Sequence, residues 1–258
     1  MPESVPQSPF SLHGRVALVT GGSRGIGAGI AKALAASGAD VVVHGNATPP
    51  EATCEGVRAL GRKAVPLVGD LADPSTPDRL VADAVAALGR LDIVVNNAGI
   101  IRRGPTVETS DADWLAVIDV NLHGVFRMCR AAGRYMLGSG HGGKIINIAS
   151  LLSFQGGVNV PAYAASKSAV AGLTREMSNE WAGQGINVNA IAPGYFRTDN
   201  TEALQKDETR SRQILERIPA GRWGETSDLD GAAVFLASRA SDYVSGQILA
   251  VDGGWFGR

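Results

Sequence analysis

The sequence predicts a doubly wound α/β domain with a seven-stranded parallel sheet and helices on both faces. Short runs of β-branched and other apolar residues alternate along the chain with helical stretches of ten or more residues. Such alternation requires right-handed crossovers between parallel strands. A glycine-rich turn, GGSRGIG at 21–27, joins the first strand to the first helix. Because parallel sheets bind ligands at the carboxyl ends of their strands, we expect the functional site at that edge.

The first half of the chain supplies four strands and three helices. The strands are expected at 15–20, 40–46, 64–70 and 91–99, and the helices at 28–38, 50–61 and 73–89. Pro74 suits the first turn of the third helix, because the missing N–H of a proline costs nothing there.

The second half continues the alternation. One long helix is expected over 111–137, with Asn121 as a polar residue amid apolar neighbours. Strands follow at 142–150, 186–194 and 246–254, and helices at 161–182 and 226–240. Thr226 or Ser227 is suited to cap the last helix. The stretch 198–219 is polar and irregular, with short helical pieces, and is typical of a lid over the strand ends.

The composition excludes several classes of protein. The 258 residues are 45% apolar and 19% charged, as in an ordinary globular domain, and suffice for one large core. The net charge of −1 predicts no nucleic acid or anionic membrane as partner. No run of about eighteen apolar residues predicts a membrane span.

The termini and cysteines indicate a compartment. Residues 1–11 are polar and proline-rich without the features of a signal peptide, so we expect a flexible extension before a domain over 12–258. Cys54 and Cys129 have no metal-ligand spacing. The expectation is a reduced, cytoplasmic protein without a metal site.

The glycine-rich turn has the context of a dinucleotide site, between a strand and a helix. Gly21, Gly25 and Gly27 permit a tight turn, close approach of the backbone to a pyrophosphate, and close packing of helix on strand. The free N–H groups and the dipole of the helix N-terminus favour phosphate. Thr20, Asp70 and 96–99 also fall at strand ends, which places them near the same ligand.

Tyr163 and Lys167 form a candidate acid/base pair. They are four residues apart in a predicted helix and therefore share one face. A positive charge near a phenol favours the phenolate, so we expect Lys167 to lower the pKa of Tyr163 from its usual value of about 10. A tyrosine in that state can exchange protons near neutral pH.

Together these motifs resemble the short-chain dehydrogenase/reductase family over residues 12–258. TGGSRGIG at 20–27 resembles its cofactor loop, NNAG at 96–99 its fourth-strand motif, and Pro193-Gly194 followed by Thr198 its nicotinamide contact. The resemblance implies a Rossmann-type fold, a homotetramer, and a catalytic tetrad of Asn121, Ser150, Tyr163 and Lys167.

By that resemblance, Tyr163 exchanges the substrate proton, Lys167 lowers its pKa and holds the ribose, Ser150 holds the substrate oxygen, and Asn121 kinks its helix and orders a water. The residues implied to hold the coenzyme are Thr20, Gly21, Ser23, Arg24, Gly25, Ile26, Gly27, His44, Asn46, Asp70, Leu71, Asn97, Ala98, Gly99, Tyr163, Lys167, Pro193, Gly194 and Thr198.

Longer stretches, among them IRRGPTVE, NAIAPGYFRTDNT and the tail AVDGGW, resemble a subgroup of that family. These are the 2-dehydro-3-deoxy-D-gluconate 5-dehydrogenases, also called 2-deoxy-D-gluconate 3-dehydrogenases, with gluconate 5-dehydrogenases nearby. The resemblance implies a sugar-acid substrate, whose carboxylate requires a cation or donors. Arg102 and Arg103 follow the NNAG turn and are the expected partners, with Gln155, Trp223 and Arg197 as further candidates for the pocket wall.

The coenzyme is NAD or NADP. NAD-binding sheets usually carry an acid at the end of the second strand, but here that place is His44-Gly45-Asn46. Arg24 could pair with the 2′-phosphate of NADP. The family resemblance tips the expectation slightly to NAD, with dual use open.

Two other functions are compatible with these residues. The first is a 3-oxoacyl-carrier-protein reductase, which would require a basic patch for its acidic carrier. The second is a catalytically silent nucleotide sensor or scaffold, since a fold does not determine a function. The intact tetrad argues against the silent protein, and the near-neutral charge argues against the carrier-protein reductase.

Overall fold

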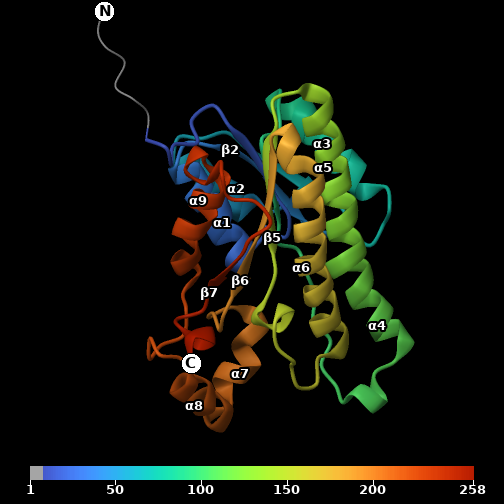
Figure 1. Ribbon diagram of the computed structural model, residues 1–258, viewed down its shortest axis with the longest axis vertical. Helices are drawn as coiled ribbons and strands as arrows, with labels where there is room; N and C mark the ends of the chain where they lie inside the picture. The colour runs from blue at the N-terminus through green and yellow to red at the C-terminus, as the bar shows by residue number, and fades with distance from the viewer. Residues whose placement is uncertain (1–7) are drawn as a thin grey trace, which may run out of the picture.

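The structure, a computed structural model, describes residues 8–258. Seven parallel strands form one sheet in the order β3-β2-β1-β4-β5-β6-β7 (Figure 1). The strands are β1 (Val16–Val19), β2 (Asp40–Gly45), β3 (Ala64–Val68), β4 (Ile93–Asn96), β5 (Gly143–Ile148), β6 (Ile186–Pro193) and β7 (Ile248–Val251). The predicted seven-stranded parallel sheet is therefore confirmed.

Helices cover both faces of the sheet (Figure 1). On one face α1 (Gly25–Ala36), α2 (Glu51–Ala59) and α9 (Asp230–Ala237) pack on the strands in one buried apolar cluster. On the other face α3 (Thr76–Leu88), α5 (Val125–Ser139) and α6 (Pro161–Trp181) enclose a second cluster. The central strands are buried on both faces, which explains their continuous apolar runs.

The strand order reverses between β1 and β4, because β2 and β3 lie on one side of β1 and all later strands on the other. This is the topological switch point, where open parallel sheets bind ligands. The short helices α7 (Glu202–Lys206) and α8 (Glu208–Arg217) belong to the predicted lid and lie beyond the carboxyl end of β6 (Figure 1).

Three helix predictions need correction. The long helix at 111–137 consists of α4 (Asp111–Ile118), a π-helical segment (Asp119–Gly124) and α5. Helix α3 begins at Thr76 with Pro77 in its first turn, because the Asp73 carboxylate accepts from the Ser75 backbone N–H at 2.9 Å and closes a turn that contains Pro74. Neither Thr226 nor Ser227 caps α9, which follows a 3₁₀ turn (Thr226–Leu229) that begins after Glu225.

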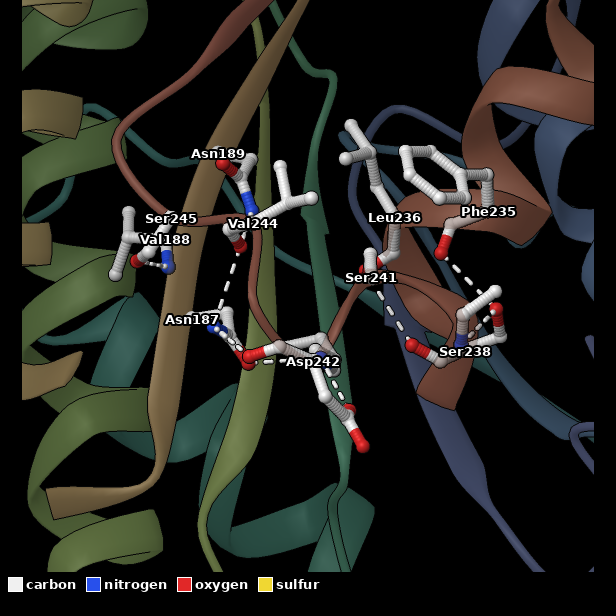
Figure 2. Close-up of polar contacts among 12 residues, drawn as sticks. Asn187, Val188, Asn189, Phe235, Leu236, Ser238, Ser241, Asp242, Val244 and Ser245 are labelled. Carbon is white, nitrogen blue, oxygen red and sulfur yellow. Dashed lines mark hydrogen bonds and ion pairs between the residues drawn. The ribbon is translucent and has the colours of Figure 1, made fainter. Parts of the chain in front are cut away.

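The segment between α9 and β7 is tied to the first half of β6 (Figure 2). The Asn187 side-chain amide donates to the carbonyl oxygens of Asp242 and Val244, both at 3.2 Å, and the Asn189 amide donates to Val244 at 2.8 Å. The Ser241 hydroxyl donates back to Leu236 at the end of α9, at 3.1 Å. These contacts set the position from which β7 runs along β6 and delivers the C-terminal residues to the site edge.

The predicted N-terminal extension at 1–11 lies mostly outside the described residues. Within residues 8–258, Phe10 packs on Phe235 of α9 at a centroid distance of 6.5 Å, and Leu12 is buried in the core. No helix in this part of the chain is long and apolar enough to cross a membrane.

Candidate active site

A cavity of about 500 Å³ opens at the carboxyl ends of β1 to β5, between the glycine turn and the first turn of the lid. The predicted residues in its walls are Gly21, Ser23, Arg24, Gly25, Ile26, Gly27, His44, Asn46, Asp70, Leu71, Asn97, Ala98, Gly99, Tyr163, Lys167 and Thr198. Seven residues that the sequence did not single out complete the walls: Ala47, Thr48, Ile100, Val120, Ile148, Asp199 and Asn200. Six of these seven adjoin, or follow by two residues, a predicted position in the chain, and this proximity was the signal available.

The glycine turn lies against the turn after β4 without room for side chains. Gly21 has a φ of +62°, and a Cβ there would lie 2.7 Å from Ala98 Cα. A Cβ on Gly27 would lie 2.3 Å from the carbonyl oxygen of Gly21. The Asn97 amide donates to the carbonyl oxygens of Thr20 and Gly21 at 2.9 and 3.0 Å. This bare backbone at the N-terminus of α1 fits the pyrophosphate of a dinucleotide.

Three of the predicted coenzyme residues lie outside the cavity walls. Thr20 is buried, and its hydroxyl accepts from the backbone N–H groups of Asn97 and Ala98 at 3.0 and 3.1 Å, so it positions the turn after β4. Pro193 ends β6, and Gly194 packs on the backbone of Asp252, where a Cβ would meet Cα at 2.7 Å.

Gly45, the last residue of β2, has no room for an acidic side chain. Burial lowers the pKa of His44, whose Nε2 lies 2.8 Å from the carbonyl oxygen of Gly69. The ring is therefore neutral and donates from Nε2. A Cβ on Gly45 would lie 2.4 Å from the carbonyl oxygen of Thr48 and 2.9 Å from Ser23 Oγ. The turn after β2 thus occupies the space that a carboxylate on this residue would need.

Tyr163 and Lys167 face the cavity together, as their spacing predicts. Burial raises the pKa of the Tyr163 phenol, while a hydrogen bond with Ser150 and the charge of Arg103 act to lower it. Lys167 Nζ lies 5.6 Å from the tyrosine ring centroid and donates to the carbonyl oxygen of Ile148 at 2.6 Å. Burial lowers the pKa of Lys167 to about 8. The prediction that Lys167 lowers the tyrosine pKa is wrong for this structure, because its hydrogen bond goes to β5 and burial of the phenol dominates.

Ser150 and Asn121 do not line the cavity. Ser150 follows β5, hydrogen-bonds Tyr163, and accepts from the Leu152 N–H at 3.2 Å. The Asn121 side chain accepts from the Ile100 N–H at 2.8 Å and donates to the Ile100 carbonyl oxygen at 2.9 Å. Asn121 lies in the π-helical segment that interrupts its helix, and its side chain fastens this segment to the turn after β4.

The two candidate arginines lie in different surroundings. Arg102 pairs with Asp113 on α4 at 3.5 Å, and both side chains are about half exposed. Arg103 donates to the backbone carbonyl oxygen of Asn200 in the lid at 3.1 Å, and its charge reaches Tyr163. Of the two, only Arg103 is placed to act at the phenol.

The other candidates for the pocket wall do not line the cavity. Gln155 Oε1 accepts from the indole N–H of Trp255 at 3.2 Å. Trp223 is buried in an apolar cluster under the lid and packs edge-on against Tyr195. Arg197 pairs with Glu225 at 3.0 Å.

Arg24 crosses the cavity mouth and pairs with Asp199 of the lid at 3.0 Å. Both side chains are more than two-thirds exposed. Among residues 8–258, no three His, Cys, Asp or Glu side chains gather as metal ligands.

Comparison with known proteins identifies the family of the chain. A short-chain dehydrogenase family model described as "Enoyl-(Acyl carrier protein) reductase" matches residues 21–256. The 2-dehydro-3-deoxy-D-gluconate 5-dehydrogenase of Dickeya dadantii is 55% identical over 96% of this chain and 98% of its own length. The gluconate 5-dehydrogenase of Gluconobacter oxydans is 46% identical over 95% and 96%.

A solved structure resembles the fold closely. The gluconate 5-dehydrogenase from Burkholderia cenocepacia, in complex with NADP and tartrate, has a TM-score of 0.91 and 43% identity, covering 97% of this chain and 98% of that one. On this family match, and on relatives more than half identical over nearly the full length, the chain belongs to the short-chain dehydrogenase/reductase family.

Proposed function

We propose that this protein is an NAD(P)-dependent oxidoreductase that interconverts the alcohol and ketone forms of a sugar acid, either 2-dehydro-3-deoxy-D-gluconate or a related gluconate. The observation that carries the proposal is that Tyr163 and Lys167 both line a cavity whose far end is a bare glycine turn, with Ser150 next to the Tyr163 phenol. The names of the relatives support the substrate class.

The coenzyme supplies the acceptor or donor of hydride, and the chain supplies the proton chemistry. During oxidation the Tyr163 phenolate takes the hydroxyl proton, and during reduction the phenol returns it. Ser150 donates to the substrate oxygen as charge develops there. The Lys167 ammonium is buried and serves as a charge beside the ring and as a donor to the ribose. Asn121 holds the turn after β4, and its role in ordering a water remains a prediction.

Both coenzymes fit the glycine turn, and the end of β2 favours NADP over the NAD that the family resemblance suggested. No carboxylate is available there to select the free 2′-hydroxyl, and the packing at Gly45 leaves no space for one. Arg24 is the cation at this end of the cavity, and its exposed pair with Asp199 is worth only about 0–1 kcal/mol. A 2′-phosphate can therefore displace it. The NADP in the B. cenocepacia structure supports this assignment.

The first prediction concerns the reaction. Absorbance at 340 nm, followed with NAD and NADP and a panel of sugar acids and acyl thioesters, should show turnover of a sugar acid. Tyr163→Phe should reduce that turnover by about a thousandfold, because the proton then has no acceptor. Turnover of thioesters alone would indicate a carrier-protein reductase, and tight coenzyme binding without turnover a silent sensor.

The second prediction concerns the substrate carboxylate. Arg103→Ala should raise KM for the sugar acid by about tenfold or more, since a hydrogen bond to a charged group is worth about 1.5–3 kcal/mol. KM for a neutral ketone should hardly change. Arg102→Ala is the matched control, because Arg102 pairs with Asp113 instead. Equal effects of the two variants would contradict the role of Arg103.

The remaining assignments concern context. Residues 12–258 form one coenzyme-binding and catalytic domain, with 198–219 as its lid. The protein works in the cytoplasm as a homotetramer. Buried free cysteines support the compartment, and apolar side chains exposed on α4 and α5, such as Leu115 and Phe126, support subunit contacts. Light scattering of the purified protein measures the subunit number.

A further inference from the structure

The C-terminal residues after β7 form a compact turn that returns to the site edge. The two Asp252 carboxylate oxygens accept from the backbone N–H groups of Gly254 and Phe256 at 2.9 and 3.0 Å. This arrangement buries Trp255, of which only 4% is exposed. No element of the proposed chemistry uses this tryptophan.

On one side, Trp255 contacts the segment that follows Ser150. Its indole N–H donates to Gln155 Oε1 at 3.2 Å, and Leu151 lies in the same buried cluster. The opposite side of this segment is held by α6, because the Ser153 hydroxyl donates to the carbonyl oxygen of Lys167 at 2.7 Å. The segment that places Ser150 is thus held between the helix of the acid/base pair and Trp255.

On its other side, Trp255 contacts the lid. The Arg217 guanidinium, at the end of α8, lies 4.1 Å from the indole centroid, and Arg258 donates to the carbonyl oxygen of Glu216 at 2.7 Å. Ile214 and Ile218 share the buried cluster. The tail is therefore fastened to α8 by a cation–π contact, a hydrogen bond and apolar packing.

A third contact joins Trp255 to the end of β6. The ring of Tyr195 lies 4.8 Å from that of Trp255 and 5.6 Å from that of Trp223, which it meets edge-on. None of these three aromatic residues lines the coenzyme cavity. Any effect of these residues on the reaction is therefore indirect, through the chain segments that they contact.

We propose that Trp255 is a positioning residue that couples the Ser150 segment to helix α8, so that the position of Ser150 depends on the position of the lid. This inference rests on the proposed function and deepens it. Its effect falls on the substrate side of the site, because the coenzyme cavity is built from other residues. Trp255→Ala removes all three contacts, whereas Trp255→Phe keeps an aromatic face for Tyr195 and Arg217 and loses only the N–H to Gln155.

The experiment compares these two variants with Met136→Ala. Met136 is a fully buried residue of α5 beside Gly143, at the opposite edge of the sheet, and its truncation destabilises the fold without touching the site. KM and kcat for the sugar acid are measured below the unfolding transition of every variant. The dissociation constant of the reduced coenzyme is measured from its own fluorescence.

Trp255→Ala should lower kcat/KM for the sugar acid by about tenfold or more, through kcat as well as KM, because Ser150 and the lid are both displaced. The coenzyme dissociation constant of Trp255→Ala should stay within about twofold of the wild-type value. Trp255→Phe should retain most of the wild-type activity. A change in kcat/KM no larger than that of Met136→Ala would overturn the proposal, as would an equal weakening of coenzyme binding.

A second measurement does not depend on turnover. Hydrogen exchange of the protein without substrate should accelerate in both 151–155 and 208–217 in Trp255→Ala, and in neither segment in Met136→Ala. Acceleration of only one segment, or of neither, would overturn the coupling. Absence of wild-type turnover with normal exchange behaviour would instead contradict the proposed function and leave the coupling standing.

Discussion

At the scale of single residues, the site is organised by opposing effects on one phenol. Burial raises the pKa of Tyr163, and Ser150 and Arg103 act against that rise. Lys167 has a pKa lowered to about 8 by burial, so it carries its full charge only below that pH. Because burial raises the pKa of the phenol, proton transfer by Tyr163 in the oxidation direction should be favoured at alkaline pH, where the phenolate forms.

A third prediction follows from the hydrogen bond between Ser150 and Tyr163. Because this bond favours the phenolate, Ser150→Ala should move the limb on which kcat/KM for oxidation rises with pH to higher pH, and it should lower kcat at neutral pH by about a hundredfold. Ser168→Ala is the control, since that hydroxyl donates only to the Leu152 carbonyl oxygen in the same region. A limb that stays in place in Ser150→Ala would show that Ser150 does not tune the phenol.

At the scale of elements, the junction of β1, the glycine turn and α1 gives the site its shape. The turn lies so close to Asn97 that the side-chain amide of Asn97 donates directly to the backbone carbonyl oxygens of Thr20 and Gly21. Position 27 must be a glycine because a Cβ would not fit there. Its φ is ordinary, so the requirement is steric and not conformational.

The fourth prediction tests this steric requirement. Gly27→Ala would place a Cβ 2.3 Å from the Gly21 carbonyl oxygen and 2.4 Å from Asn97 Nδ2, so the turn must move. Coenzyme affinity, measured by titration of reduced-coenzyme fluorescence, should fall by about a hundredfold, a loss of about 2.7 kcal/mol. Gly231→Ala on α9, where a Cβ meets open space, should bind as the wild type does. An unchanged affinity in Gly27→Ala would mean that the turn is not the pyrophosphate site.

At the scale of the whole molecule, the two ends of the strands have different roles. The carboxyl ends of the strands carry the site, and the amino ends carry a buried charge cluster. Asp92 is 2% exposed and accepts from the Val16 N–H at 2.9 Å, from Arg15 at 2.9 Å and from Arg90 Nε at 2.7 Å. Burial alone would raise the pKa of Asp92, but these hydrogen bonds outweigh burial and lower it.

The fifth prediction concerns stability. Asp92→Asn should destabilise the fold by about 1–3 kcal/mol, because it removes the buried charge that accepts hydrogen bonds from two half-exposed arginines. Since the folded pKa of Asp92 is lowered, its stabilisation is complete above the unfolded value of about 3.9 and is lost as the pH falls through the folded pKa. The difference in Tm between wild type and variant should therefore be large at pH 7 and shrink below about pH 4. An equal difference at both pH values would exclude the ionised carboxylate as the cause.

The elements of the fold differ in how far the sequence alone predicts them. All seven strands read as apolar runs, including the partly exposed β3 and β7, whereas the interruption of the long helix was expected only from the family resemblance, at Asn121. The π-helical segment at Asp119–Gly124 keeps the apolar periodicity of its neighbours, and it differs only through the contacts of Asn121 with the distant Ile100. Pro74 and Pro77 are equally suited to a first helical turn, and the carboxylate of Asp73 decided between them.

The sequence by itself determined the sheet, the edge that carries the site, the glycine turn and the shared face of Tyr163 and Lys167, because each depends on spacing within one element. Only the tertiary structure decided that the charge of Arg103 and not that of Arg102 acts on the phenol, that packing at Gly45 leaves no room for an acid there, and that Gln155 and Trp223 belong to the support around Trp255. These outcomes depend on which distant segment offers a partner to a side chain, and that choice is made by packing.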